Sequence, residues 1–464
     1  MIIRRTRSVC PVCLKNIPAV LEQEENGRIY MSKTCEAHGG FRALIWQGGM
    51  NFAAWSRGGA ELAEGQGLSC PGNCGLCGEH ESGSCCVLLE VTDRCNLHCR
   101  YCFADPKCSA ADPSSDPAFE ELERQIRDLA KRCGQPLLQL SGGEPTLRDD
   151  LPDLIRAARS AGCSYVQVNT NGIRLAQDPG YVQALAEAGL DIVFLQFDGT
   201  REEIYEQLRG RPLLQEKIRA IENCGKAGIG VTLVPTVVPG VNDQNLGELV
   251  RFAAEHMPDV RGIHFQPVSY FGRILEDGGP GGGVLGSGIP GSGVSGGGVS
   301  GGGIPEERYT LDRLMTDLAE QAGFSTEVFQ PSRCDHPLCG FHAQFLVRPG
   351  GRLKPLTNFS HSSPERGTAR DNREYVGRHW RRPEEEAAPA GLQDSELADE
   401  MDFDTFLYCL RHRSLTLSAM AFQDAMNLNI ERLHRCTLHV YDKGQVRPFC
   451  AQYLTAVTAI VPGK

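Results

Sequence analysis

Residues 95–103, CNLHCRYCF, follow directly on the apolar run VLLEVT at residues 87–92. Short runs rich in apolar and β-branched residues predict strands, so the cysteines are expected on a loop that leads from a strand into a helix. The thiolates of Cys95, Cys99 and Cys102 could bind at most three corners of a 4Fe-4S cube, whose usual protein ligands are four cysteines. The same spacing recurs at Cys70, Cys74 and Cys77, so the position after a strand is what sets the Cys95 triplet apart.

The sequence after this loop alternates short apolar runs with amphipathic stretches. Five further strands are predicted, at residues 137–140, 165–168, 192–197, 231–237 and 262–266. Helical periodicity is found between them, including residues 119–132, 151–161 and 246–256. Repeated strand–helix units with near-continuous apolar strands indicate a parallel sheet. Six of them fit a partial barrel whose functional site lies at the carboxyl ends of the strands.

Two motifs at these strand ends resemble the signature of the radical SAM superfamily. One is the cysteine triplet, with Tyr101 just before its last member, and the other is the segment SGGEP at residues 141–145. The resemblance implies that Cys95, Cys99 and Cys102 hold the cluster that binds S-adenosylmethionine (SAM), and that glycines let the backbone approach the methionine ammonium group. The residues that it implies around SAM are Tyr101, Gly142, Gly143, Glu144, Pro145, Asn169, Asn171, Gln196 and Asp198. Turn chemistry is the alternative reading of the last four.

The whole layout also resembles the tetraether lipid synthases and their bacterial relatives, some once described as pterin methyltransferases. The matching segments are residues 8–13, 33–39, the cysteine-rich lead-in from Cys70, residues 334–340, 435–436 and 448–450. Two features depart from that family: the Gly-rich insertion, and the absence of a cysteine just ahead of residues 420–424. The resemblance implies one SAM-binding 4Fe-4S cluster, two auxiliary clusters and a rubredoxin-like mononuclear iron or zinc.

The composition agrees with a metal-rich enzyme. The chain has 464 residues, 20 cysteines and a net charge of −11, and it has no apolar run of spanning length and no signal peptide. The acidic balance argues against nucleic acid as a partner. We expect a cytoplasmic protein whose cysteines stay reduced and serve as metal ligands.

The other cysteines form three groups. A Cys-x2-Cys turn and a second turn after a predicted hairpin are typical of a tetrahedral zinc or iron knuckle. Its ligands would be Cys10, Cys13, Cys35 and, as the nearest fourth candidate, His38. A second set, Cys70, Cys74 and Cys77, would be completed by Cys86 or by its neighbour Cys85. A dispersed third set comprises Cys334, Cys339, Cys436 and Cys450. Buried, unliganded thiols are the alternative for this third set.

The predicted organisation is α/β: a partial (βα)6 barrel with a small N-terminal knuckle and a C-terminal iron-sulfur part. The predicted units are residues 1–66 (knuckle), 67–86 (auxiliary cluster segment), 87–276 (barrel), 277–303 (Gly-rich flexible loop) and 304–464 (C-terminal auxiliary cluster domain). Cys108, Cys133, Cys163, Cys224 and Cys409 are expected to be structural or incidental.

The reaction that the resemblance implies is reductive cleavage of SAM to a 5′-deoxyadenosyl radical, which removes hydrogen from an unactivated C–H bond. A lipid substrate, with two alkyl termini joined carbon to carbon, is the first expectation, and methyl transfer to a pterin or another heterocycle is the alternative. A non-catalytic iron-sulfur electron carrier is a third. The electron donor would be a ferredoxin or flavodoxin, and contact with the inner membrane face would be peripheral. No side chain is assigned to the chemical step.

A lipid substrate would need an apolar tunnel leading away from the strand ends. The residues expected to roof it are Phe341, Phe345, Phe403, Phe406 and Met420. The alternative is that these side chains form the core of the C-terminal part.

Overall fold

A computed structural model describes most of the chain. The described residues are 1–57, 62, 65–72, 74–104, 112–272, 308–357, 367–384, 386–387 and 403–457. The Gly-rich segment at 277–303 and Cys108 lie outside them. None of the described helices is long and apolar enough to cross a membrane.

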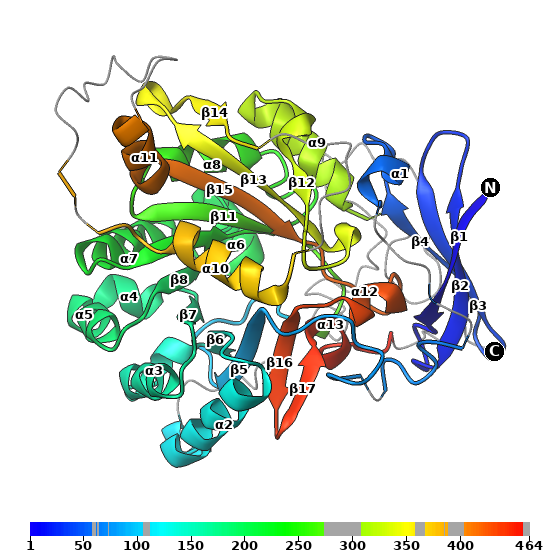
Figure 1. The fold of residues 1–464 in the computed structure, drawn as a ribbon, viewed down its shortest axis with the longest axis horizontal. Helices are drawn as coiled ribbons and strands as arrows, with labels where there is room; N and C mark the ends of the chain where they lie inside the picture. Colours follow the sequence, from blue (N-terminus) through cyan, green and yellow to red (C-terminus); the bar gives the residue numbers. More distant parts are fainter. Residues whose placement is uncertain are drawn as a thin grey trace.

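The N-terminal part is a four-stranded antiparallel sheet, drawn in blue at the edge of the molecule (Figure 1). Its strands are β1 (Ile2–Val9), β2 (Asn16–Gln23), β3 (Ile29–Cys35) and β4 (Gly39–Trp46). A short helix, α1 (Phe52–Trp55), follows, and the rings of Trp46 and Trp55 pack with centroids 6.2 Å apart. The carboxylate of Asp312, on α9 (Leu311–Ala322), accepts hydrogen bonds from the backbone of Gln47 and Gly48 at 3.0 and 2.9 Å. These contacts fix the small sheet to the rest of the protein.

The six predicted barrel strands are present, and neighbours in the sheet run parallel. They are β5 (Cys86–Thr92), β6 (Leu137–Gly142), β7 (Tyr165–Thr170), β8 (Ile192–Gln196), β9 (Gly230–Val234) and β11 (Val260–Pro267). The short β10 (Thr236–Val237) pairs with β11. The helices between them are α2 (Phe119–Arg132), α3 (Leu151–Ser160), α4 (Ile173–Gln177), α5 (Pro179–Glu187), α6 (Glu202–Arg209), α7 (Leu214–Lys226) and α8 (Leu246–Glu255). The α/β partial-barrel prediction is confirmed.

The C-terminal segment adds strands to both edges of the barrel sheet rather than standing apart from it. At one edge β15 (Ser414–Met420) pairs parallel with β11, followed by β13 (Gly340–Val347), β12 (Gln330–Pro331) and β14 (Leu353–Pro355). At the other edge β16 (Leu438–Asp442) pairs parallel with β5, and β17 (Gln445–Pro448) follows antiparallel. The helices of this segment, besides α9, are α10 (Ala369–Trp380), α11 (Phe403–His412), α12 (Ile430–His434) and α13 (Phe449–Gln452).

Helix α10 packs against the inner side of the barrel (Figure 1). The ring of Trp380 lies 5.2 Å from that of Phe194 and 5.9 Å from that of His264, centroid to centroid. A Cβ on Gly377 would come within 1.7 Å of the Tyr165 ring, so the helix backbone rests directly on the first residue of β7. Because Tyr165 begins its strand, α10 covers the amino ends of the barrel strands.

Candidate active site and metal centres

A cavity of about 260 Å³, which we call the lumen, runs along the inside of the barrel. Cys95, Cys99 and Cys102 line it where the strands end, and Trp380 and Val376 of α10 line it where they begin. Side chains alternate along a strand, so Cys86 and Leu88 of β5 face the lumen while Val87, Leu89 and Val91 pack outward in the core. The other residues assigned to SAM that line the lumen are Tyr101, Gly142, Gly143, Glu144, Asn169, Asn171 and Gln196.

Gly142, which ends β6, and Gly143, which follows it, let this loop pack directly on the loop that carries the cysteines. The Gly143 amide donates to the Thr92 carbonyl and the Glu144 amide to the Arg94 carbonyl, both at 2.7 Å. A Cβ on Gly142, whose φ is +127°, would lie 2.2 Å from the Thr92 oxygen, and a Cβ on Gly143 would lie 2.1 Å from the Arg94 oxygen. The glycines are therefore required to position residues 92–95, whatever they contribute to SAM.

The Glu144 side chain is buried and bonds neighbouring loops. Its carboxylate accepts from the Thr170 hydroxyl and the Asn171 amide, both at 2.7 Å, and from the Thr146 amide at 3.0 Å. The Asn171 side chain in turn donates to Asn96 at 2.7 Å, inside the cysteine loop. These two residues tie three strand ends together, and their assignment to SAM stays a prediction.

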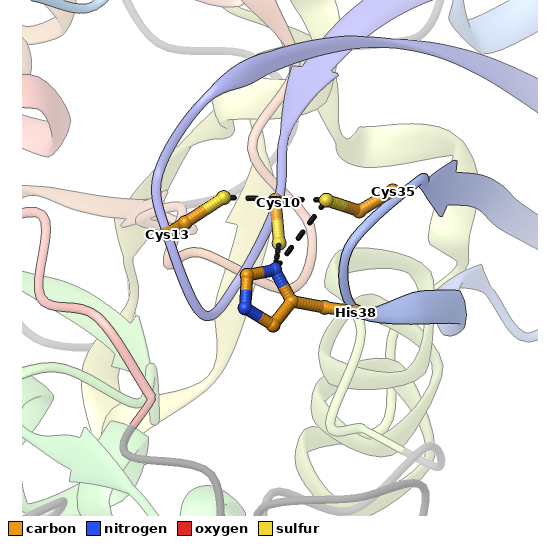
Figure 2. A group of neighbouring side chains, drawn as sticks. All are labelled: Cys10, Cys13, Cys35 and His38. Atoms are coloured by element: carbon orange, nitrogen blue, oxygen red, sulfur yellow. Dashed lines mark hydrogen bonds between the residues drawn. The ribbon is translucent and has the colours of Figure 1, made fainter.

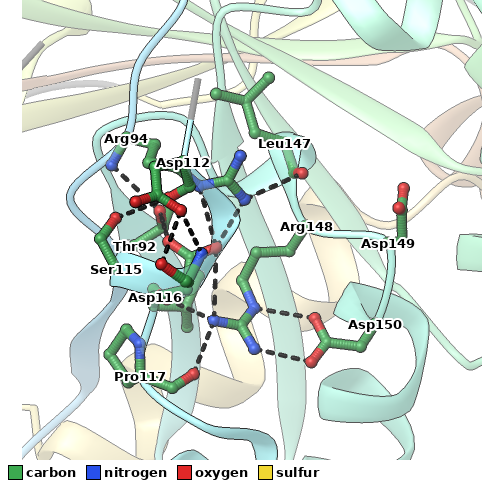
Figure 3. A network of polar contacts seen from close by, with 12 residues as sticks. Thr92, Arg94, Asp112, Ser115, Asp116, Pro117, Leu147, Arg148, Asp149 and Asp150 are labelled. Atoms are coloured by element: carbon green, nitrogen blue, oxygen red, sulfur yellow. Dashed lines mark hydrogen bonds and ion pairs between the residues drawn. The ribbon is translucent and has the colours of Figure 1, made fainter. Parts of the chain in front are cut away.

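An ion-pair network anchors the start of the cysteine loop (Figure 3). The Arg94 guanidinium binds Asp116 with an Nη2–Oδ2 distance of 2.5 Å and donates to the Leu147 carbonyl at 3.2 Å. Asp116 also accepts from Thr92. Arg148 bonds the backbone carbonyl of Val91 at 3.1 Å and that of Pro117 at 2.9 Å. The last residues of β5 are thus held on both sides just before Cys95.

Two buried cations beside the cysteine loop carry no motif and were missed by the sequence reasoning. Arg209 forms a bidentate pair with Asp198, with both N–O distances 2.7 Å, and also hydrogen-bonds the Cys99 thiol. Burial lowers the pKa of Arg209, but the charges of Asp198 and Cys99 outweigh burial and raise it. Lys217 donates to the Gln196 side chain at 2.9 Å, and burial lowers its pKa to about 8. The Asp198 carboxylate is therefore paired with Arg209, and of these two residues it is Arg209 that lines the lumen.

The N-terminal sheet brings Cys10, Cys13, Cys35 and His38 together (Figure 2). The His38 Nδ1 lies 3.5 Å from the Cys10 sulfur and 3.4 Å from that of Cys35, and the Cys13 and Cys35 sulfurs are 4.0 Å apart. Metal–sulfur bonds of about 2.3 Å and metal–nitrogen bonds of about 2.0 Å at tetrahedral angles separate ligand atoms by about 3.6–3.8 Å. The set fits one metal ion. The His38 hydrogen bond lowers the pKa of Cys35 to about 6, which favours the thiolate that a metal requires.

Members of the second cysteine group lie close together, and its role as a cluster site stays a prediction. Cys70 lies next to Cys74, and the charges of Cys436 and Cys77 also act on Cys74. The Nε2 of His434 is 3.6 Å from the Cys70 sulfur. Cys86, expected to complete this set, begins β5, and the strand's alternation turns its thiol to Gln139 in the lumen at 3.8 Å. Cys85 likewise lines the lumen, where its sulfur accepts from Asn372 at 3.1 Å.

Three of the four cysteines of the third group lie within electrostatic reach of one another. Burial, together with the charges of Asp335, Cys450 and Cys339, raises the pKa of Cys436. The Arg432 Nε donates to the Cys339 sulfur at 3.3 Å. Cys334 lies instead beside Thr437, with 3.7 Å between its sulfur and the hydroxyl, and within electrostatic reach of Cys85. None of the cysteines that the structure describes forms a disulfide.

The aromatic roof expected over the site is not present. Phe341 and Phe345 pack in the main core, with ring centroids 4.5 Å from Phe329 and 4.8 Å from Phe324 respectively, because β13 joins the barrel sheet and turns them onto its helices. Phe403 is 71% exposed, and Phe406 is half-buried on the same helix, α11. Of the five described residues named for the roof, Met420 alone lines the lumen.

Comparison with known families finds matches to the barrel and to the N-terminal sheet. Residues 89–253 match the family described as the radical SAM superfamily, and residues 2–47 match the HMPTM N-terminal zinc ribbon domain. The 7,8-dihydro-6-hydroxymethylpterin dimethyltransferase of Methanocaldococcus jannaschii is 34% identical over 96% of this chain and 92% of that protein. The GTP 3′,8-cyclase of Rhodopirellula baltica is 33% identical over 39% of this chain and 50% of that protein. Streptococcus suis SuiB bound to S-adenosylmethionine is 19% identical, with a TM-score of 0.34, over 41% of this chain and 42% of that chain.

The superfamily implies a 4Fe-4S cluster and SAM, and three thiols at the carboxyl end of the lumen fit a cluster with one open iron. The similarity to the M. jannaschii protein extends over nearly the whole of both chains. The chain belongs to the radical SAM superfamily, in the family that includes the M. jannaschii protein.

Proposed function

We propose that this enzyme uses a SAM-derived radical to remove hydrogen from an unactivated C–H bond of a substrate in the lumen and then forms a carbon–carbon bond there. The observation that carries the proposal is the continuity of the lumen from the three cysteines to α10. A substrate in this space lies directly below the place where the radical is made. The barrel walls also exclude water, which protects a reactive intermediate from side reactions.

Each group of residues has a distinct task in this proposal. Cys95, Cys99 and Cys102 hold the cluster, and the loop around Gly143 receives the methionine part of SAM. When bound, the cluster and SAM together supply the 5′-deoxyadenosyl radical, while the protein binds and orients the reactants. Arg209, fixed by Asp198, holds positive charge beside Cys99. A ferredoxin or flavodoxin is the proposed source of the electron.

Alkyl chains are the first substrate class that the lumen supports. Apolar side chains line it from end to end, as a saturated chain requires. They include Leu88, Leu97, Leu137, Phe194, Val234, Val376, Trp380, Met420, Phe422, Leu438 and Phe449. Two chain ends converted to carbon radicals in turn would be joined carbon to carbon. A lipid would have to enter from a membrane surface, so this reading includes peripheral membrane contact.

Methyl transfer to a pterin-like heterocycle is the second candidate, and a different observation favours it. Near α10 the lumen also has amide side chains: the Gln167 amide donates to Gln139 at 2.7 Å, and its own oxygen has no partner. Amides in a cavity that the rings of Trp380 and His264 also line suit a flat ring with hydrogen-bonding edges. The M. jannaschii relative is named for action on such a ring.

The test begins with the anaerobically reconstituted protein, SAM and a chemical reductant. Formation of 5′-deoxyadenosine is expected, and its absence would favour an electron carrier. Mass spectrometry then separates the substrates: lipids lose two hydrogens for each new bond, whereas a pterin gains one methylene mass for each transfer.

A substitution in the lumen tests whether the substrate lies there. Val376→Phe would fill the space next to Trp380 and should abolish product while SAM cleavage continues unproductively. The matched variant Val376→Leu should keep both activities. Full product formation by Val376→Phe would place the substrate elsewhere.

A further inference from the structure

Arg209 is a buried cation that ends helix α6, and its side chain is 5% exposed. It binds the Asp198 carboxylate through two N–O contacts of 2.7 Å and also donates a hydrogen bond to the Cys99 sulfur. We propose that this hydrogen bond raises the reduction potential of the SAM-binding cluster, so that Arg209 sets how readily the cluster accepts its electron. The inference rests on the proposed function, in which Cys99 is one of the three cluster ligands.

The partners of Arg209 fix the direction in which its guanidinium points. Nε and Nη2 donate to the two oxygens of Asp198, and Nη2 also donates to the Thr236 hydroxyl at 3.3 Å. Because the guanidinium is a rigid planar fork, this arrangement leaves Nη1 to face Cys99. The Asp198 carboxylate is itself held by the Thr236 amide at 3.1 Å and by the Gln196 side chain. The cation, rather than the carboxylate, therefore faces the sulfur.

The surroundings of Cys99 make a neighbouring charge effective. This residue packs against a small buried cluster, which comprises Leu97, Ile173, Tyr205 and Leu213. Electrostatic interactions are stronger where water is excluded. Lys217, which is 0% exposed, is a second cation whose charge interacts with that of Cys99. Both cations therefore act on this ligand through a medium that screens them little.

The hydrogen bond favours the reduced form of the cluster. Reduction is a one-electron step: a low-potential donor is oxidised, the cluster gains one negative charge, and no proton or bond is transferred. Reduction potentials of iron-sulfur clusters depend on their net charge and on hydrogen bonds to their sulfurs. A cation beside a cluster ligand stabilises the more negative state, so the potential rises. The cluster thereby accepts an electron from a weaker reductant than it would without Arg209.

The experiment measures the midpoint potential in the full-length, anaerobically reconstituted protein without SAM, by a redox titration followed by electron paramagnetic resonance. The SAM-binding cluster is identified as the signal that changes when SAM is then added. Asp198→Asn combined with Arg209→Gln leaves neither buried charge unpaired. Its potential should fall by about 59 mV, the equivalent of a tenfold change in the one-electron equilibrium. Asp198→Asn alone keeps the cation and removes the neutralising carboxylate, so the potential should rise.

Two further variants separate charge from direct hydrogen bonding. Lys217→Gln also leaves no charge unpaired, because Lys217 donates to neutral oxygens of Asn171 and Gln196. Its potential should fall by less than that of the double variant, since Arg209 bonds the sulfur directly. Arg156→Gln, which removes an exposed cation paired with Asp153 on α3, is the control and should match the parent protein. Iron and sulfide content shows that each variant holds its clusters.

Three results would overturn the inference. An unchanged potential in the double variant, at full iron and sulfide content, would mean that Arg209 does not act on the cluster. Weaker SAM binding with that unchanged potential would make Arg209 a SAM ligand instead. A fall in Asp198→Asn as large as in the double variant would mean that only the packing of the pair matters. By contrast, a parent protein without any SAM-responsive signal would contradict the proposed function together with this inference.

Discussion

The N-terminal knuckle and the cysteine loop of the barrel both present cysteine thiols, but they form different kinds of site. In the knuckle, three sulfurs and one nitrogen lie within 4.8 Å of one another and leave no place for a further ligand. On the barrel loop, three thiols face a cavity of about 260 Å³. Closed ligand sets are typical of structural metal sites, and an open position is typical of reactive ones. In the proposed function, the barrel loop is the reactive site because its three thiols leave one iron of the predicted cluster without a protein ligand.

The two regions also differ in which residues hold their cysteines in position. All knuckle ligands lie between residues 10 and 38, on turns of one small sheet. The barrel loop is held by distant residues: Gly142 and Gly143 from the next strand, Asn171 from the one after, and Arg209 from helix α6. A local site tolerates changes elsewhere, whereas a site assembled from several strands responds to each of them.

The largest expected effect comes from emptying the open site. Replacing Cys95, Cys99 and Cys102 by alanine should reduce 5′-deoxyadenosine formation by more than about 100-fold, since changes that only touch supporting residues cost about 10–100-fold. The purified protein should lose about four irons and keep the knuckle metal. Iron, sulfide and nucleoside analysis measures all three. Continued SAM cleavage would remove the triplet from the active site.

The next effect concerns the buried ion pair below the open site. Asp198→Asn leaves Arg209 buried without its partner, because the side chains are 0% and 5% exposed. Such a loss costs about 3–5 kcal/mol of unfolding free energy, which chemical denaturation can measure. Asp149→Asn, which breaks the exposed pair with Arg174, is the control and should change little. Equal stability of the two variants would contradict the importance assigned to Arg209.

Sequence reasoning was most reliable where the signal is local. The barrel strands are continuous apolar runs, and the segment at 141–145 stands at a strand end, so fold and motif could be predicted together. The edge strands β15 and β16 could not, because their parallel partners β11 and β5 lie some 150 and 350 residues earlier in the chain. Arg209 and His434 were missed for the same reason: each acts through a partner that is distant in the chain.

A glycine substitution tests whether the barrel loop depends on residues from the next strand while the knuckle does not. Gly142→Ala places a Cβ 2.2 Å from the Thr92 oxygen, so the loops must separate. We expect a loss of about 1–3 kcal/mol in stability and about 10–100-fold in SAM cleavage, with the knuckle metal retained. Gly134→Ala also changes a glycine with positive φ, but its +63° lies in the left-handed region that other residues can adopt, and nothing lies within 4 Å of the added atom, so it should cost only a modest backbone strain. Equal losses in both variants would mean that loop packing is unimportant.

The smallest effect on activity is expected from removing one ligand of the N-terminal knuckle. Cys13→Ser removes one of the four knuckle ligands, and its partly buried position on a turn leaves the rest of the sheet intact. The variant should lose one metal ion per chain yet retain SAM cleavage when a chemical reductant supplies the electron. Lys15→Ser, two residues along the same turn and not a ligand, should lose neither. If Cys13→Ser also lost the cluster absorbance, the knuckle would be part of the radical site, because the Asp312 contacts would then transmit its collapse into the barrel. Retained metal in the variant would mean that His38 and two thiolates suffice to hold the ion.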